Sequence, residues 1–166
     1  MNLKKFSVFL LFFLIGCGYK PSTLYQNKIL GDNINAKVVI DPKNPRETIF
    51  LTDAVRDAIY TVFDKNLCFS GCDTTLEVNP SASSLIPLDY DENGYPILYR
   101  SKVVLKVTLK DKSGKIRNYT VTGTYDFNVA PQSVLTDQIK LDAYKKASIN
   151  ALNRLFAKIT KDGAEQ

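Results

Sequence analysis

The sequence predicts an α+β fold in which two helices pack on one face of a mostly antiparallel four-stranded sheet, as a two-layer sandwich. Two segments, about 47–65 and about 134–160, carry apolar residues at helical spacing. Between them, the chain is rich in β-forming residues that alternate between apolar and polar. The order strand, helix, several antiparallel strands, helix favours helices that cover one face of a sheet.

The N-terminus has the features of a bacterial lipoprotein signal. Lys4 and Lys5 precede an apolar run of about ten residues, which is shorter than the roughly 17–25 residues that span a bilayer. Leu14-Ile15-Gly16-Cys17 resembles the lipobox, in which the cysteine becomes acylated. We therefore expect 1–16 to be a lipoprotein signal peptide that is cleaved before Cys17. The alternatives are a buried N-terminal helix and an ordinary cleaved signal with an incidental cysteine.

Acylation predicts that diacylglycerol and palmitate chains on Cys17 hold the protein to a membrane, since several chains anchor durably. Gly18 follows the cysteine, and no aspartate is there to signal inner-membrane retention in the known sorting systems. The lipobox resemblance therefore implies the outer membrane, with the domain on the periplasmic side. Residues 17–35 are polar and rich in turn formers, and we expect them to be the acylated N-terminus and a tether.

We expect one domain at 36–160 and a tail at 161–166. The first strand is short and ends at Pro42. The sequence Asn44-Pro45-Arg46-Glu47 has a capping residue, a proline at the first helical position and a glutamate at the third. Ser133 is a plausible cap for the second helix. The predicted strands are 36–41, 74–78, 97–110 and 116–129, with part of 79–96 as loop.

The last two strands flank a short Gly-containing connection at 111–115 and predict a hairpin. Strands usually have 3–10 residues, so these long ones predict a bend or bulge, with Gly123 as its candidate. Residues 89–94 match the first half of a calcium loop, but Arg100 stands where a bidentate glutamate is needed. An Asn93-Gly94 turn explains these residues better.

Cys68 and Cys72 remain once Cys17 is acylated. Paired cysteines of an exported chain usually form a bridge in an oxidising compartment, so a structural disulfide is expected. A metal site would need about four ligands, and the chain has no histidine. Redox catalysis is the other alternative.

Catalysis is not expected. Without histidine the chain lacks the commonest general base and every triad that uses one. It has no Gly-rich phosphate loop either, so we predict no catalytic residues, cofactor or metal. The net charge of +5 comes from basic residues spread along the chain, and nucleic acid is not an expected partner.

Four basic residues share one face of the third predicted strand. Arg100, Lys102, Lys106 and Lys110 have the same parity and span roughly 34 Å at about 3.4 Å per residue. They point away from the apolar set Val103, Leu105, Val107 and Leu109. One interpretation is a solvated face whose lysines discourage edge pairing. The other is a ladder that binds phosphates or another polyanion, beside hydroxyls and amides of the partner strand (Asn118, Thr120, Thr122 and Thr124).

Taken together, the lipobox, the order of helices and strands and the basic strand resemble the LptE family of lipopolysaccharide-assembly lipoproteins. The resemblance rests on Gly16-Cys17-Gly18-Tyr19, on Leu51-Thr52-Asp53-Ala54-Val55-Arg56, and on the long strand pair followed by a C-terminal helix. It implies two helices against a four-stranded sheet that plugs an LptD β-barrel, assists its assembly and binds lipopolysaccharide. It further implies that Arg100 and Lys106 contact lipid A. The pair Cys68 and Cys72 departs from the family pattern.

Two other functional classes stay open. A membrane-tethered lipoprotein that activates a peptidoglycan synthase also combines a lipobox with a small domain, but a tether of about 18 residues argues against a long reach. An enzyme with an unusual carboxylate site would need a dense acidic cluster.

Overall fold

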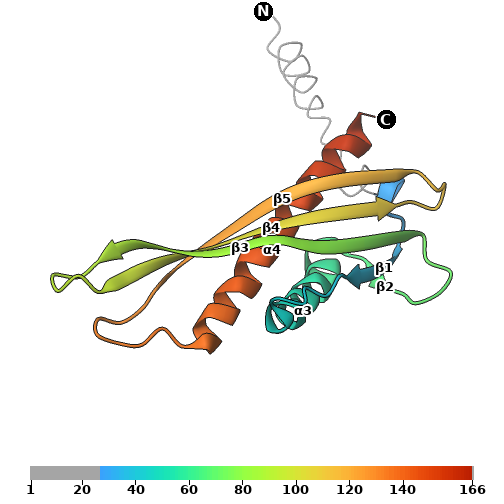
Figure 1. Ribbon diagram of the computed structural model, residues 1–166. Coiled ribbons are helices and arrows are strands. Elements are labelled where there is room, and N and C mark those ends of the chain that lie inside the picture. The colour runs from blue at the N-terminus through green and yellow to red at the C-terminus, as the bar shows by residue number, and fades with distance from the viewer. Residues whose placement is uncertain (1–26, 166) are drawn as a thin grey trace, which may run out of the picture.

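The computed structural model describes residues 27–165, so the predicted signal peptide, Cys17 and the first part of the predicted tether lie outside the described residues. The described chain has an α+β fold with one five-stranded sheet, in the order β2-β1-β3-β4-β5, and two long helices on one side of it (Figure 1). Residues 27–30 form a further short helical segment. The elements are β1 (Asn33–Val38), α3 (Pro45–Thr61), β2 (Asn66–Leu67), β3 (Thr74–Tyr90), β4 (Pro96–Lys110), β5 (Ile116–Asn128) and α4 (Asp137–Ala164).

The predicted α+β class is confirmed, but two details of the predicted sheet were wrong. The sheet has five strands and is mixed, because β1 runs parallel to both β2 and β3, whereas β3, β4 and β5 are antiparallel. Helix α3 carries the chain back to the end of the sheet where β1 starts, so β2 and β3, which follow it, run parallel to β1. Strand β2 has only two residues, which is too short for a periodic signal.

Strand β3 is much longer than predicted and continues through two prolines to Tyr90. Strand β1 ends at Val38, which pairs with Val78, so one edge of β3 is free beyond that point. A proline is tolerated on such an edge because it has no N–H to donate. Register shifts follow Pro80 and Pro87 and absorb the irregularity.

Of the bend or bulge that we predicted at Gly123, the bulge is absent, since β4 and β5 pair without a register shift. Gly123 instead lies where α4 comes closest to the sheet. A Cβ atom at this position would lie 1.9 Å from the backbone oxygen of Ala147 and 2.9 Å from Cβ of Ala151. Only glycine allows this helix–strand contact.

The core lies between the sheet and the helices, and its members are fully or almost fully buried. The strands contribute Leu76, Val78, Val103, Leu105, Val107, Leu109 and Val121, and the helices contribute Leu51, Val55, Ile59, Leu152, Leu155 and Ile159. Phe63 and Phe156 stack with ring centroids 5.7 Å apart. The apolar faces that the sequence predicted therefore meet each other.

The fold is longer at both ends than the predicted range 36–160. Ile29, Leu30 and Ile34 are buried in the core, so the end of the predicted tether belongs to the domain. The Thr74 hydroxyl donates to the carbonyl of Leu30 and fastens this segment to β3. Helix α4 continues to Ala164 and takes up most of the predicted tail.

The helix boundaries differ by a few residues from the prediction. Helix α3 begins at Pro45, as the capping sequence indicates, and ends at Thr61. Helix α4 begins three residues later than predicted, because Thr136 and not Ser133 is its cap. The Thr136 hydroxyl accepts the N–H of Ile139, whereas the Ser133 hydroxyl donates to the carbonyl of Ala130 in the preceding turn.

Both predicted turns are present. The Asn93-Gly94 turn joins β3 to β4, with Gly94 at φ +80°, and the Asp91 carboxylate accepts the N–H groups of Asn93 and Tyr95. Asp111 plays the same part between β4 and β5, where it accepts from Ser113, Lys115 and Arg117.

Cys68 and Cys72 are joined by a disulfide, with their Cα atoms 5.9 Å apart. The bridge closes a loop between β2 and β3, in which Gly71 has φ +68°. A tight loop of this kind needs a residue that accepts positive φ without strain, and glycine does so.

We expect Gly123→Ala to lower the free energy of unfolding by about 3 kcal/mol, because the added methyl overlaps α4 and must push the helix off the sheet. Urea unfolding followed by circular dichroism measures this change. Thr122→Ala, one residue away on the same strand, is the control and should cost less than about 1 kcal/mol. Equal losses for the two variants would contradict the close approach.

The Asp111 carboxylate contributes stability that depends on pH. Hydrogen bonds from Ser113, Arg117 and Lys115 lower its pKa from 3.8 to about 2 against the opposing effect of burial. Because the folded-state pKa is depressed, the contribution is complete above the unfolded pKa and is lost as pH falls from about 4 to about 2. We therefore expect the stability difference between wild type and Asp111→Asn to be constant near neutral pH and to shrink in this window, as urea unfolding would show. A difference that grows on acidification would contradict it.

Candidate anion-binding face

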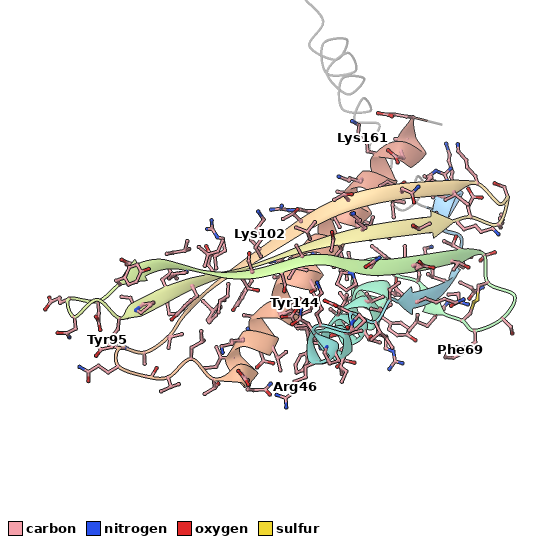
Figure 2. The ribbon with its side chains drawn as sticks, in the orientation of Figure 1. Arg46, Phe69, Tyr95, Lys102, Tyr144 and Lys161 are labelled. Carbon is pink, nitrogen blue, oxygen red and sulfur yellow. A yellow bond between two sulfur atoms is a disulfide. The ribbon has the colours of Figure 1, made fainter. Side chains whose placement is uncertain are left out.

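The sheet face away from the helices carries a row of exposed lysines. Lys102, Lys106 and Lys110 of β4 are exposed, whereas the residues between them on the other face are buried. Figure 2 shows Lys102 on the side of the sheet opposite to Tyr144, which α4 places beneath the sheet. The predicted separation of a basic face from an apolar face is confirmed.

The neighbouring strands place uncharged polar residues on both sides of Lys102 and Lys106, whereas Lys110 lies between Thr75 and Ile116. Lys106 lies between Asn79 of β3 and Thr120 of β5, and Lys102 lies between Ser84 and Thr124. Thr120 and Thr124 are two of the four neighbours that the sequence predicted on β5, and β3 adds Asn79 and Ser84. A lysine flanked by hydroxyl groups has donors beside it for the oxygens of a phosphate.

The three lysines form no ion pair or side-chain hydrogen bond with any residue in 27–165. The carboxylates nearest in register belong to Glu77 of β3, which pairs with Thr108 between Lys106 and Lys110, and to Asp126 of β5, which pairs with Arg100 next to Lys102. The lysine charges are therefore left for solvent or a ligand.

Arg100 differs from the three lysines because it already has a partner. Its Nε and Nη2 atoms donate to the two carboxylate oxygens of Asp126 at 2.7 and 2.6 Å. This two-point contact raises the pKa of Arg100 and lowers the pKa of Asp126. The charge of Arg100 is thus balanced within the protein, and the four residues of the predicted ladder are not equivalent.

Two further cations, which the sequence did not indicate, lie at the edge of this face. Asn150, Arg154 and Lys158 of α4 donate to the backbone oxygens of Thr124, Thr122 and Thr120, at 2.7–2.8 Å. Each side chain is one turn after the last, so α4 covers the outer edge of β5. The four-residue spacing is visible in the sequence, but polar residues at this spacing usually indicate a solvated helix face.

None of the described helices is long and apolar enough to cross a membrane. Within 27–165, no three potential ligands among the Cys, Asp and Glu side chains are grouped so that they could hold a metal ion.

Solved structures with the same fold include two lipoproteins. Rare lipoprotein B from Shewanella oneidensis superposes with a TM-score of 0.53 at 12% identity, over 81% of this chain and 98% of that one. A candidate lipoprotein from Caulobacter crescentus superposes with a TM-score of 0.52 at 10% identity, over 88% and 100%. No protein-family model and no curated sequence matches the chain. At these identities the likeness shows that the chain shares the fold of these lipoproteins.

Proposed function

We propose that the protein is an outer-membrane lipoprotein, anchored through acylated Cys17, that binds lipopolysaccharide and supports an LptD-like β-barrel as its plug. The observation that carries the proposal is the row of lysines on the helix-free sheet face, which have no ion-pair partner within 27–165. Lys102, Lys106 and Lys110 stand beside hydroxyl groups there, which suits the phosphates of lipid A. The role is one of binding and assembly, without catalysis.

The shape of the domain supports a role inside a larger partner. The far halves of β3 and β4 form an arm that extends beyond both helices (Figure 1). The arm exposes four large apolar or aromatic side chains, which are between 40 and 57% exposed: Ile86, Leu88, Tyr90 and Tyr95. Tyrosine and aliphatic residues of this kind are typical anchors of protein interfaces. The arm would contact the wall of the barrel while the lysines face the lipid.

The two faces of the sheet would then have separate tasks. The helix-covered face stabilises the fold, and the open face remains free for an anionic ligand. Arg100 would serve mainly to hold β4 to β5 through Asp126, so the lysines carry the binding.

We expect Lys102→Glu combined with Lys106→Glu to weaken lipopolysaccharide binding at least about tenfold, since two attractive charges become repulsive. Binding to fluorescently labelled lipopolysaccharide, with circular dichroism to check folding, measures this. Lys43→Glu combined with Lys161→Glu changes the net charge equally and lies off the sheet face, so it should bind as wild type does. Arg100→Ala should have a smaller effect than Lys106→Ala. Unchanged binding of the first variant would mean that the lysines are only solvated.

The mature protein should co-purify with a large β-barrel from outer membranes solubilised in mild detergent. Size-exclusion chromatography and mass spectrometry of the complex test this. Recovery of a free monomer would count heavily against the plug function. Recovery with a peptidoglycan synthase would support the alternative class.

A further inference from the structure

The outer edge of β1 is open over half of its length. Strand β2 pairs with Asn33 and Ile34 alone and then ends at Leu67. Residues along a parallel strand direct their backbone groups alternately to its two neighbours. The Ile34 carbonyl accepts from Cys68 on the β2 side, whereas Val39 donates to Val78 on the β3 side.

This alternation assigns Ala36 and Val38 to the same side as Ile34. Their N–H and C=O groups point to where β2 would continue, and no strand among residues 27–165 occupies that place. The open edge therefore offers two donors and two acceptors in the geometry of a sheet.

The disulfide loop is the reason that β2 does not continue along this edge. After Leu67 the chain enters the loop closed by Cys68 and Cys72 and returns to the sheet at Thr74. Phe69, in this loop, is 95% exposed (Figure 2). The loop leaves Ala36 and Val38 without a paired strand on this side and places the exposed ring of Phe69 beside the edge.

A groove runs along the open edge between β1 and α3, with a cavity of about 90 Å³. Val38, Val55 and Leu67 give it an apolar lining, and Phe69 lies at its rim. A strand added beside β1 would direct alternate side chains towards α3, and the cavity has room for one short apolar side chain.

Arg56 supplies the charge of this groove. It lines the cavity from α3, is exposed, and has no salt-bridge partner in the described part of the chain. The acidic residue next to it, Asp57, instead binds Lys145 of α4 at 2.8 Å. On the other face of β1, Lys37 is exposed as well. Lys37 lies beside Glu77 of β3, so the charge that a carboxylate of an added segment would complement is that of Arg56.

We propose that the open edge of β1 binds an extended segment of a partner protein, which adds to the sheet as a strand. The segment carries a short apolar side chain for the cavity and an acidic side chain for Arg56. This surface lies at the opposite edge of the sheet from β5, and its use does not depend on the lysines of the open face.

The other edges support this assignment. Side chains of α4 cover the edge of β5, and prolines and register shifts interrupt the free edge of β3. Proteins generally block exposed edges in such ways, because an unpaired edge is a template for another strand. The edge at Ala36 and Val38 is not covered by helix side chains and contains no proline or register shift, and it borders a cavity.

The test uses the purified full chain in detergent and a blocked hexapeptide, Val-Thr-Glu-Thr-Val-Thr, whose valines and glutamate share one face of an extended strand and can all point towards α3. A peptide with lysine in place of glutamate is the matched control. We expect the glutamate peptide to protect the Ala36 and Val38 amides from hydrogen exchange and to bind at least about tenfold more tightly than the lysine peptide. Arg56→Glu should remove this preference, whereas Arg46→Glu, on the same helix outside the groove, should keep it.

Ala36→Pro removes one N–H donor of the open edge and should weaken binding of the glutamate peptide about tenfold. Lys106→Glu, on the other face of the sheet, should leave binding of this peptide unchanged. The proposal is overturned if millimolar peptide leaves both amides unprotected, or if the two peptides bind equally. It is also overturned if the free chain forms a dimer that Ala36→Pro dissociates, because the edge would then bind a second copy.

Discussion

The contact of Gly123 with α4 sets the position of the helix on which the other features of the sheet depend. The backbone of α4 at Ala147 and Ala151 lies where a side chain at residue 123 would be, so helix and strand meet without a side chain between them. At this short distance the side chains of Arg154 and Lys158 reach past β5 to its outer carbonyls. A helix held further away could cover the core but could not cover the edge.

The edges of the sheet differ in whether another strand could pair with them. The β5 edge is covered by hydrogen bonds from α4, which satisfy backbone oxygens that would otherwise face solvent. The free half of β3 carries Pro80 and Pro87, which cannot donate to another strand. The remaining edge, at Ala36 and Val38, is left open by the turn of the chain into the disulfide loop. Docking by strand addition is therefore directed to one place.

The two faces of the sheet also differ, because one is buried under the helices and the other is exposed and charged. Hydrophobic burial accounts for one face, where the helices exclude water from the strands. On the other face, hydrogen-bonding residues lie on both sides of Lys102 and Lys106, and no carboxylate within 27–165 pairs with these lysines. Arg100 is the exception, because its register places it opposite Asp126. A charged residue that has a partner holds strands together, whereas one that has none remains available for a ligand.

The sequence by itself determined the α+β class, both long helices, the two turns and the separation of Lys102 and Lys106 from the core, because each follows from local periodicity or turn chemistry. Tertiary structure decided the rest. The pairing of Arg100 with Asp126 joins residues 26 apart and depends on strand register. The lengthening of β3, the short β2, the role of Gly123 and the open edge of β1 all depend on which strand lies beside which. No local pattern encodes that choice, since it results from packing distant segments around one core.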